Sequence, residues 1–117
     1  ELLVVVAIIG ILSAVGVVSY SGYKASAEKK QAEITLNSIY LAEQEYKSNN
    51  GEYYFNSSTS NLVNNLFDGV DDLSEQTFTF STTNANTLTI TATKKSDSNC
   101  RISITQTNKK PTTTSAC

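Results

Sequence analysis

The sequence contains no histidine among its 117 residues. This absence excludes Ser-His-Asp and Cys-His nucleophilic machinery and removes the commonest transition-metal ligand. Charge is sparse as well, because 9 basic and 11 acidic residues give a net charge of −2, and no basic run is longer than two residues. We therefore do not expect an enzyme, a cofactor, a metal site or a general affinity for nucleic acid.

Apolar residues are concentrated at one end of the chain. Of the 17 residues from 2 to 18, 14 are apolar, and only Gly10, Ser13 and Gly16 interrupt them. Each glycine costs about 1 kcal/mol in a helix interior. They are candidates either for local unwinding of the helix or for close approach of a neighbouring helix.

The apolar run is long enough to cross a membrane. Extended to residue 23 without a charge, it would form a helix of about 33 Å. Tyr20 and Tyr23 then fall where interfacial aromatic residues belong, with Lys24 just beyond them. The helical pattern continues past this point, which favours a membrane-spanning segment over residues 1–23 rather than a cleaved signal peptide.

Glu1 precedes the apolar run. A carboxylate near a helix N-terminus is favourable by a few tenths to about 1 kcal/mol. The same carboxylate at the edge of a membrane or a packed apolar core is costly unless a cation pairs with it. The residues alone leave both interpretations open.

The helix is predicted to continue far beyond the apolar run. No proline occurs from residue 24 to 50, and apolar residues recur there at spacings of three, four and seven. This stripe consists of Ala25, Ala32, Leu36, Ile39, Tyr40 and Tyr46. Charged residues are assigned to the other faces, with Glu43 and Lys47 as a favourable i,i+4 pair. Asn49-Asn50-Gly51 is a C-cap signal, so we predict one helix over 1–52, apolar all round over 1–23 and amphipathic over 24–52.

The remaining residues, 53–117, are predicted to form a globular head. Half of the residues from Asn56 onward are Ser, Thr or Asn, and a helical turn is expected near residues 62–67. Strict alternation then predicts strands at 77–81, 88–93 and 101–105, separated by turns at 83–86 and 95–99. An antiparallel sheet that is apolar on one face needs a cover, and the amphipathic half of the helix supplies it. The predicted fold class is α+β, with a sheet of three to four strands.

Cys100 and Cys117 are the only cysteines and have 16 residues between them. Beside a membrane-type N-terminus, they favour a disulfide formed in an oxidising compartment. Closing this loop would stabilise the fold by about 3 kcal/mol on the chain-entropy model. Two free thiols are the alternative.

The N-terminal sequence resembles the signature of type IV pilins and their pseudopilin relatives. The resemblance is strong over the first 25 residues, which begin ELLVVVAIIGILSAV, and extends more weakly through IYLAEQEY at 39–46. It implies a glutamate that pairs with the N-terminal amine of a neighbouring subunit, and Glu1 matches that position. Many family members carry a proline at this point of the helix, where it marks a bend. This chain has Val18 there instead, so the resemblance does not imply a sharp kink. The cysteine pair resembles the one that bounds the C-terminal loop of many pilins.

The resemblance implies a structural subunit of a type IV pilus. Such a subunit is cut by a prepilin peptidase and N-methylated, resides in the inner membrane, and is assembled by dedicated machinery into a helical surface filament of identical subunits. The filament would serve twitching motility, adhesion or DNA uptake. The alternatives are a pseudopilin or minor pilin of a type II secretion or competence machinery, and a monomeric membrane-anchored binding domain.

Three weaker signals lie in the head. Five cations near the C-terminus are candidates for contact with DNA or another anionic surface: Lys94, Lys95, Arg101, Lys109 and Lys110. The acidic run formed by Asp68, Asp71, Asp72 and Glu75 matches no EF-hand spacing, which favours plain surface charge over calcium binding. Asn56-Ser57-Ser58 is a formal glycosylation sequon.

Overall fold

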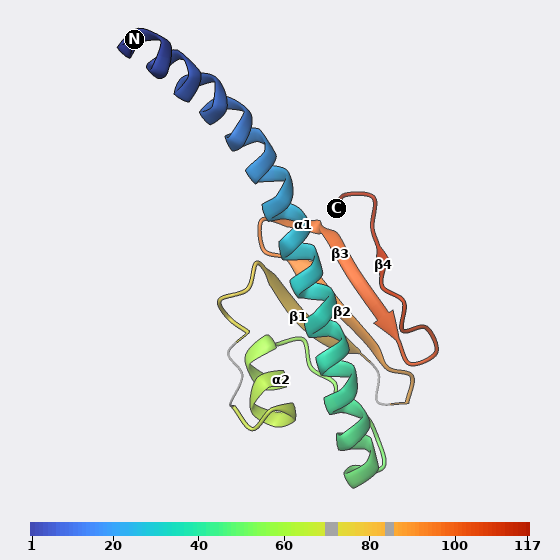
Figure 1. The fold of residues 1–117 in the computed structure, drawn as a ribbon. Coiled ribbons are helices and arrows are strands. Elements are labelled where there is room, and N and C mark those ends of the chain that lie inside the picture. Colours follow the sequence, from blue (N-terminus) through green and yellow to red (C-terminus); the bar gives the residue numbers. More distant parts are fainter. Residues whose placement is uncertain (70–72, 84–85) are drawn as a thin grey trace. The chain divides into compact units, whose positions relative to one another are not determined.

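The computed structural model describes residues 1–69, 73–83 and 86–117. The described elements are helix α1 (Leu2–Asn50), helix α2 (Thr59–Leu66), and strands β1 (Phe78–Thr83), β2 (Thr89–Lys94), β3 (Asp97–Thr105) and β4 (Thr112–Thr113) (Figure 1). The chain has two compact units, Glu1–Lys30 and Gln31–Cys117. The second half of α1 therefore belongs to the same unit as the sheet. The predicted α+β class is confirmed.

Helix α1 ends where the sequence predicted. Gly51 has a φ of +84°, in the left-handed region that favours glycine, and its N–H donates to the carbonyl of Lys47 at 2.7 Å. This is the single-bond C-cap in which the residue after the helix satisfies a carbonyl of the last turn. The Asn-Asn-Gly stop signal is thereby confirmed.

The four strands form one antiparallel sheet in the order β1-β2-β3-β4. Each strand follows its neighbour directly, so every connection is a hairpin. The register shifts between Thr93 and Lys94, and Lys94 pairs with Asp97. The β2–β3 turn is therefore tighter than predicted, because residues 97–99 belong to β3 rather than to a loop. Strand β4 supplies the fourth strand of the expected three to four, and part of the predicted turn at 83–86 lies outside the described residues.

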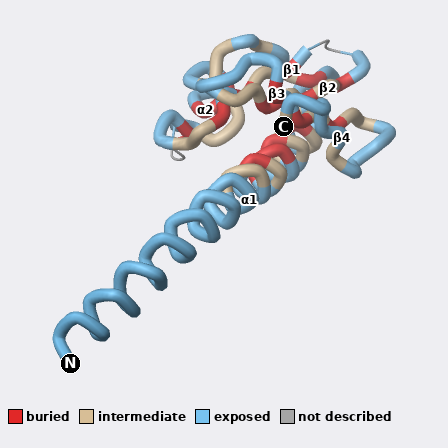
Figure 2. The backbone as a smooth tube through the Cα atoms, turned by 90° about the horizontal axis from the view of Figure 1, so that it is seen from above, coloured by how far each residue is buried: buried red, intermediate tan, exposed pale blue. Residues whose placement is uncertain are grey.

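One face of the sheet forms the core of the second unit. Cross-strand rows place Phe80 beside Ala92 and Ile102, and all three are almost fully buried. Ala32, Leu36, Ile39, Leu62 and Val63 from α1 and α2 join the same cluster, which appears as the red stretches of Figure 2. The alternation of the strands and most of the helix stripe are confirmed; Ala25 is exposed and does not contribute to it.

Candidate functional site

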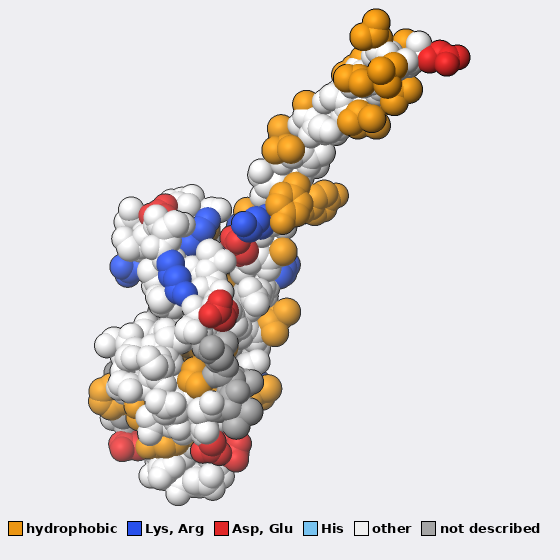
Figure 3. Space-filling model, turned by 90° about the vertical axis from the view of Figure 1, so that its left-hand side faces the viewer, with side chains coloured by type: hydrophobic (Ala, Val, Ile, Leu, Met, Phe, Trp, Pro, Cys, Tyr) orange, Lys and Arg blue, Asp and Glu red, His pale blue; other side chains and the backbone are white. Residues whose placement is uncertain are grey.

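The first unit contains an apolar helical segment, Leu2 to Val18, with no covering layer among the described residues. Twelve large aliphatic side chains between Leu2 and Val18 are each 52–86 % exposed. Figure 3 shows these hydrophobic side chains gathered along the N-terminal part of α1. The segment is long and apolar enough to cross a membrane. It is therefore compatible with insertion into a bilayer.

Two serine hydroxyls in the N-terminal part of α1 are satisfied by the helix itself. Ser13 Oγ donates to the carbonyl of Ile9 at 2.7 Å, and Ser21 Oγ donates to that of Val17 at 3.1 Å. Hydroxyls that bond back to their own helix present little unpaired polarity to an apolar environment. Both serines are thus compatible with lipid or with apolar neighbouring helices.

Glu1 lies immediately before α1 and is exposed. Its backbone carbonyl accepts the first helical hydrogen bond, from Val5 N at 3.2 Å. The carboxylate therefore sits at the positive end of the helix dipole. This position accommodates either interpretation of Glu1, the local cap or the partner for a neighbour's cation.

Gly10 and Gly16 lie within an uninterrupted part of α1. A Cβ added at either position would meet no atom within 4 Å. The helix is also continuous through Val18, where many pilins have proline. Both glycines therefore keep open surface available for close approach, and the helix of the single chain is not unwound at either one.

The two cysteines form a disulfide, with their Cα atoms 4.7 Å apart. This confirms the predicted pairing and excludes two free thiols. The disulfide joins the buried Cys100 of β3 to the last residue of the chain. The C-terminal loop is therefore closed covalently.

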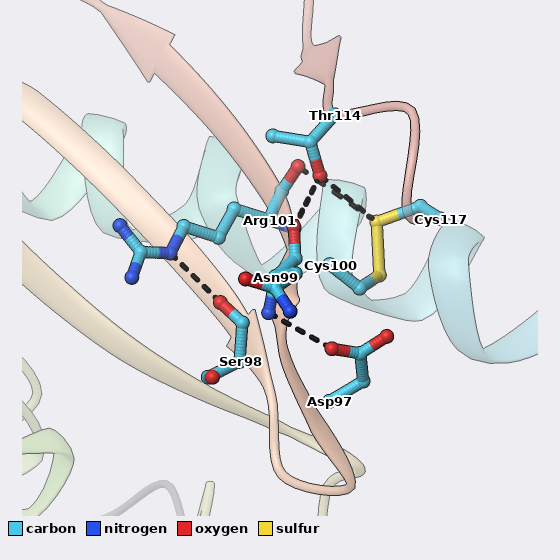
Figure 4. The surroundings of a disulfide bond; sticks show 7 residues. All are labelled: Asp97, Ser98, Asn99, Cys100, Arg101, Thr114 and Cys117. Atoms are coloured by element: carbon cyan, nitrogen blue, oxygen red, sulfur yellow. Dashed lines mark hydrogen bonds between the residues drawn. A yellow bond between two sulfur atoms is a disulfide. The ribbon is translucent and has the colours of Figure 1, made fainter.

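Thr114 supports the disulfide loop through its hydroxyl, which Figure 4 shows beside Asn99, Arg101 and Cys117, and through its N–H. Its hydroxyl donates to the carbonyl of Asn99 at 2.7 Å and accepts the N–H of Arg101 at 3.0 Å. Its own N–H donates to the carbonyl of Arg101 at 2.9 Å. The C-terminal tail is thus held to the first part of β3 by backbone bonds as well as by the disulfide.

The five candidate cations do not form one patch. Lys94, Lys95 and Arg101 lie near the β2–β3 turn, whereas Lys109 and Lys110 lie in the β3–β4 connection at the other end of β3. Several of these side chains already have partners. The Nζ of Lys95 donates to the carbonyl of Ser74, Arg101 Nε donates to that of Ser98, and Lys109 Nζ lies 5.0 Å from the centroid of the Tyr40 ring. The geometry gives little support to a DNA-binding surface.

The acidic run is only partly described. Asp68 and Glu75 are exposed, and Asp71 and Asp72 lie outside the described residues. Within the described ranges, no group of three or more Asp, Glu, Cys or His is placed to hold a metal. In the sequon, Asn56 Oδ1 accepts the N–H of Ser58 at 2.8 Å, which is a local Asx turn.

The prediction that Glu43 lies on the polar face of the helix is wrong. The residue is 0 % exposed, and its Oε2 accepts the N–H of Tyr54 at 2.9 Å. Lys47, its predicted partner, has its Nζ 4.5 Å from the centroid of the Tyr53 ring instead. The missed signal was the spacing, because Glu43 follows Leu36 by seven residues and Ile39 by four, which places it on the buried stripe.

Comparisons of the chain with protein-family models, with curated proteins and with solved structures gave no match. The fold itself is an N-terminal apolar helix whose second half packs on a four-stranded antiparallel sheet, closed by a C-terminal disulfide. This combination is consistent with a pilin-like fold.

Proposed function

We propose that the chain is a structural subunit of a type IV pilus, and that it assembles through its apolar N-terminal helix into a helical surface filament. One observation carries this proposal. The exposed apolar segment of α1 and the helix face that packs into the disulfide-closed head belong to a single continuous helix. The N-terminal part of α1 therefore suits an apolar environment, whereas the head, whose apolar side chains are buried in its own core, suits water.

The apolar segment is incompatible with water as its final environment. Burying one large aliphatic side chain is worth about 1.5–3 kcal/mol. Twelve such residues, each more than half exposed, amount to on the order of 20 kcal/mol. This exceeds the about 5–15 kcal/mol that stabilises a whole domain. The segment therefore needs lipid, or other apolar helices, around all of its faces.

A filament core replaces one apolar environment by another. Lipid chains and aliphatic side chains are similarly apolar, so moving the segment from the inner membrane into a bundle of identical helices changes its free energy little. Gly10 and Gly16 leave room on the helix surface for neighbouring backbones to approach. The resemblance adds a prepilin peptidase and the pilus assembly machinery as partners.

In this proposal Glu1 selects and orients the incoming subunit. A carboxylate surrounded by apolar helices is tolerated only when a cation pairs with it. The N-terminal amine of a neighbouring subunit is the cation that the resemblance implies. A pairing of this kind fixes the axial register of two otherwise featureless apolar helices.

The test is Glu1→Gln, which removes the charge and keeps the side-chain shape. Glu45→Gln is the matched control, because Glu45 is exposed on the same helix. We expect wild type and Glu45→Gln to form sheared surface fibres that are visible by electron microscopy and contain this chain by mass spectrometry. Glu1→Gln should give no fibres while the chain remains in the inner membrane with its head folded.

Normal fibres from Glu1→Gln would refute the assembly role of Glu1. If the wild-type chain stays in the membrane and no fibre contains it, the monomeric anchored domain replaces the pilus subunit. If it occurs only as a trace component of fibres built from another subunit, or only within a secretion or competence complex, a minor pilin or pseudopilin replaces the major subunit.

A further inference from the structure

Glu43 is a buried carboxyl group that the proposed filament does not use. Its side chain is fully enclosed in the second unit, with Oε2 bonded to the Tyr54 N–H. Its Oε1 is also buried and has no hydrogen-bond partner within the described ranges. An ionised carboxylate in this position is poorly solvated, so the enclosure favours the neutral acid.

The surroundings of Glu43 offer little to offset an ionised charge. The buried side chains of β1, β2 and β3 are apolar apart from Thr82. On α1 the titratable groups nearest to Glu43 in the chain are the exposed Glu45, the phenols of Tyr40 and Tyr46, and Lys47, whose Nζ lies over the Tyr53 ring. Lys109 Nζ lies over the Tyr40 ring, and the Tyr46 ring packs edge-on against that of Tyr54. Beyond the helix, the phenols of Tyr53 and Tyr54 accept hydrogen bonds from Gln44 and from Asn65. Burial raises the pKa of Glu43 from 4.5 to about 7, and the Tyr54 N–H acts in the opposite direction.

Tyr54 belongs to a segment that covers the outer edge of the sheet. We call residues 53–59 the edge cover. Strand β1 is an edge strand, since β2 is its only neighbour in the sheet. The N–H of Thr82 donates to the carbonyl of Asn56 at 2.9 Å, and the N–H of Phe80 donates to Thr59 Oγ1 at 2.9 Å. The edge cover thus satisfies outward-facing groups that would otherwise be open for pairing with another strand.

The edge cover is fixed at Tyr54 from both sides. Glu43 in α1 accepts the Tyr54 N–H, and the buried hydroxyl of Thr82 in β1 donates to the Tyr54 carbonyl at 3.0 Å. The same hydroxyl accepts the N–H of Asn56 at 3.0 Å. Tyr54 is therefore held through its N–H by the helix and through its carbonyl by the sheet.

We propose that Glu43 is a pH-sensitive latch, which in its neutral form holds the edge cover closed over β1 and on ionisation favours its opening. The neutral acid stays buried and accepts the Tyr54 N–H. The anion gains solvation only when the segment lifts and water reaches the carboxylate. Opening then uncovers the N–H groups of Phe80 and Thr82. This inference is independent of the filament, because every group in it lies in the second unit.

The size of the effect follows from proton linkage. With a pKa of about 7 when closed and 4.5 when open, the opening equilibrium is pH-independent below 4.5 and rises as the pH passes from 4.5 through 7. Between pH 6 and pH 8 the opening constant should increase about tenfold.

Native-state hydrogen exchange on the full chain in detergent micelles tests the latch. Rates are divided by the intrinsic rates of an unstructured chain at each pH. The amides of Tyr54, Phe80 and Thr82 report on the cover, and those of Ile90 and Ile104 report on the sheet. We expect the cover amides to exchange through a lower-energy opening than the sheet amides, and that opening to increase about tenfold from pH 6 to pH 8.

Glu43→Gln should make the cover opening independent of pH, whereas Glu45→Gln, at an exposed position, should behave as wild type. Three results would overturn the proposal. The cover amides could exchange together with the sheet amides, their corrected exchange could be flat with pH in wild type, or Glu43→Gln could retain the wild-type pH dependence. The first two results are measured on wild type, so they can refute the latch even if Glu43→Gln does not fold.

Discussion

Removing the Cys100–Cys117 disulfide should cost the second unit about 3 kcal/mol of unfolding free energy. The bond closes a loop of 17 residues, and loop closure of that size restricts the unfolded chain by about 3 kcal/mol on the chain-entropy model. Cys100 is buried in the core, so replacing its sulfur by hydrogen in Cys100→Ala adds about 1 kcal/mol for lost packing. The double variant Cys100→Ala/Cys117→Ala should therefore lose about 3–4 kcal/mol.

The folded tail should nevertheless remain in place in that variant. Thr114 holds it to β3 through its hydroxyl and its N–H, and Thr112 pairs with Ser103 in the sheet. Removing the disulfide therefore lowers stability mainly by giving the unfolded chain more conformational entropy, and only to a lesser extent by removing contacts in the native state. Thr114→Val is the matched comparison, because it removes the hydroxyl bonds and keeps the disulfide; it should cost only about 1 kcal/mol.

Equilibrium urea unfolding of the full chain in micelles, followed by circular dichroism, measures both variants. Wild type under reducing conditions provides a second route to the open loop. A loss below about 1 kcal/mol in the double variant would refute the loop-closure argument. So would a Thr114→Val penalty as large as that of the double variant, because the hydrogen bonds would then be the main support of the loop.

Two further predictions concern the buried face of the second unit. Since the pKa of Glu43 is raised to about 7, its stabilising contribution is complete below pH 4.5 and is lost as the pH rises through 7. In urea unfolding, wild type should therefore lose about 2–3 kcal/mol between pH 5 and pH 8 relative to Glu43→Gln. Parallel pH profiles of the two proteins would contradict this. Ile102→Ala, at a fully buried position, should cost about 2–5 kcal/mol in the same assay. Ile34→Ala removes the same atoms from a side chain that is 67 % exposed and should change stability by less than about 0.5 kcal/mol. Equal losses at these two positions would show that the burial assigned to one of them is wrong.

The elements predicted correctly are those encoded by short-range periodicity. Alternation of Phe78 and Phe80 with threonine marks a strand that is buried on one face, and the structure pairs this strand with β2 as expected. The end of α1 is encoded just as locally, because a glycine after two asparagines fits the left-handed C-cap at Gly51. Such features depend on neighbours within a few residues, so one sequence suffices to predict them.

The edge cover could not be predicted in the same way. Asn56 and Thr59 reach β1 across more than 20 residues of chain, through bonds to Thr82 and Phe80. No local pattern marks those pairings, since the stretch from Asn56 to Asn61 has only the composition of a loop. Residue 97 joined β3 for a similar reason, because the register shift that pairs it with Lys94 is a property of two strands together.

Glu43 shows how a correct local rule can give a wrong assignment. An i,i+4 Glu–Lys pair stabilises an exposed helix by only a few tenths of a kcal/mol. Packing Leu36 and Ile39 against the sheet is worth several times more. The burial of these two side chains fixes the rotation of the helix, and that rotation turns Glu43 inward with them. The Glu43 carboxyl then accepts a hydrogen bond from the Tyr54 N–H, and Lys47 Nζ lies over the Tyr53 ring rather than pairing with Glu43.

Glu43 in α1 and Glu1 immediately before α1 are both carboxyl groups for which an apolar environment is costly, and the cost is met differently in each case. Glu43 is buried by its own chain, where desolvation raises its pKa and so favours its neutral form, and the Tyr54 N–H supplies one backbone donor. Glu1 is exposed in the single chain and, in the proposed filament, becomes buried only when another subunit arrives with a cation. Replacing Glu43 should therefore change stability and its pH dependence without affecting assembly. Replacing Glu1 should affect assembly and leave the stability of the head unchanged, and measuring both variants in both assays separates the two roles.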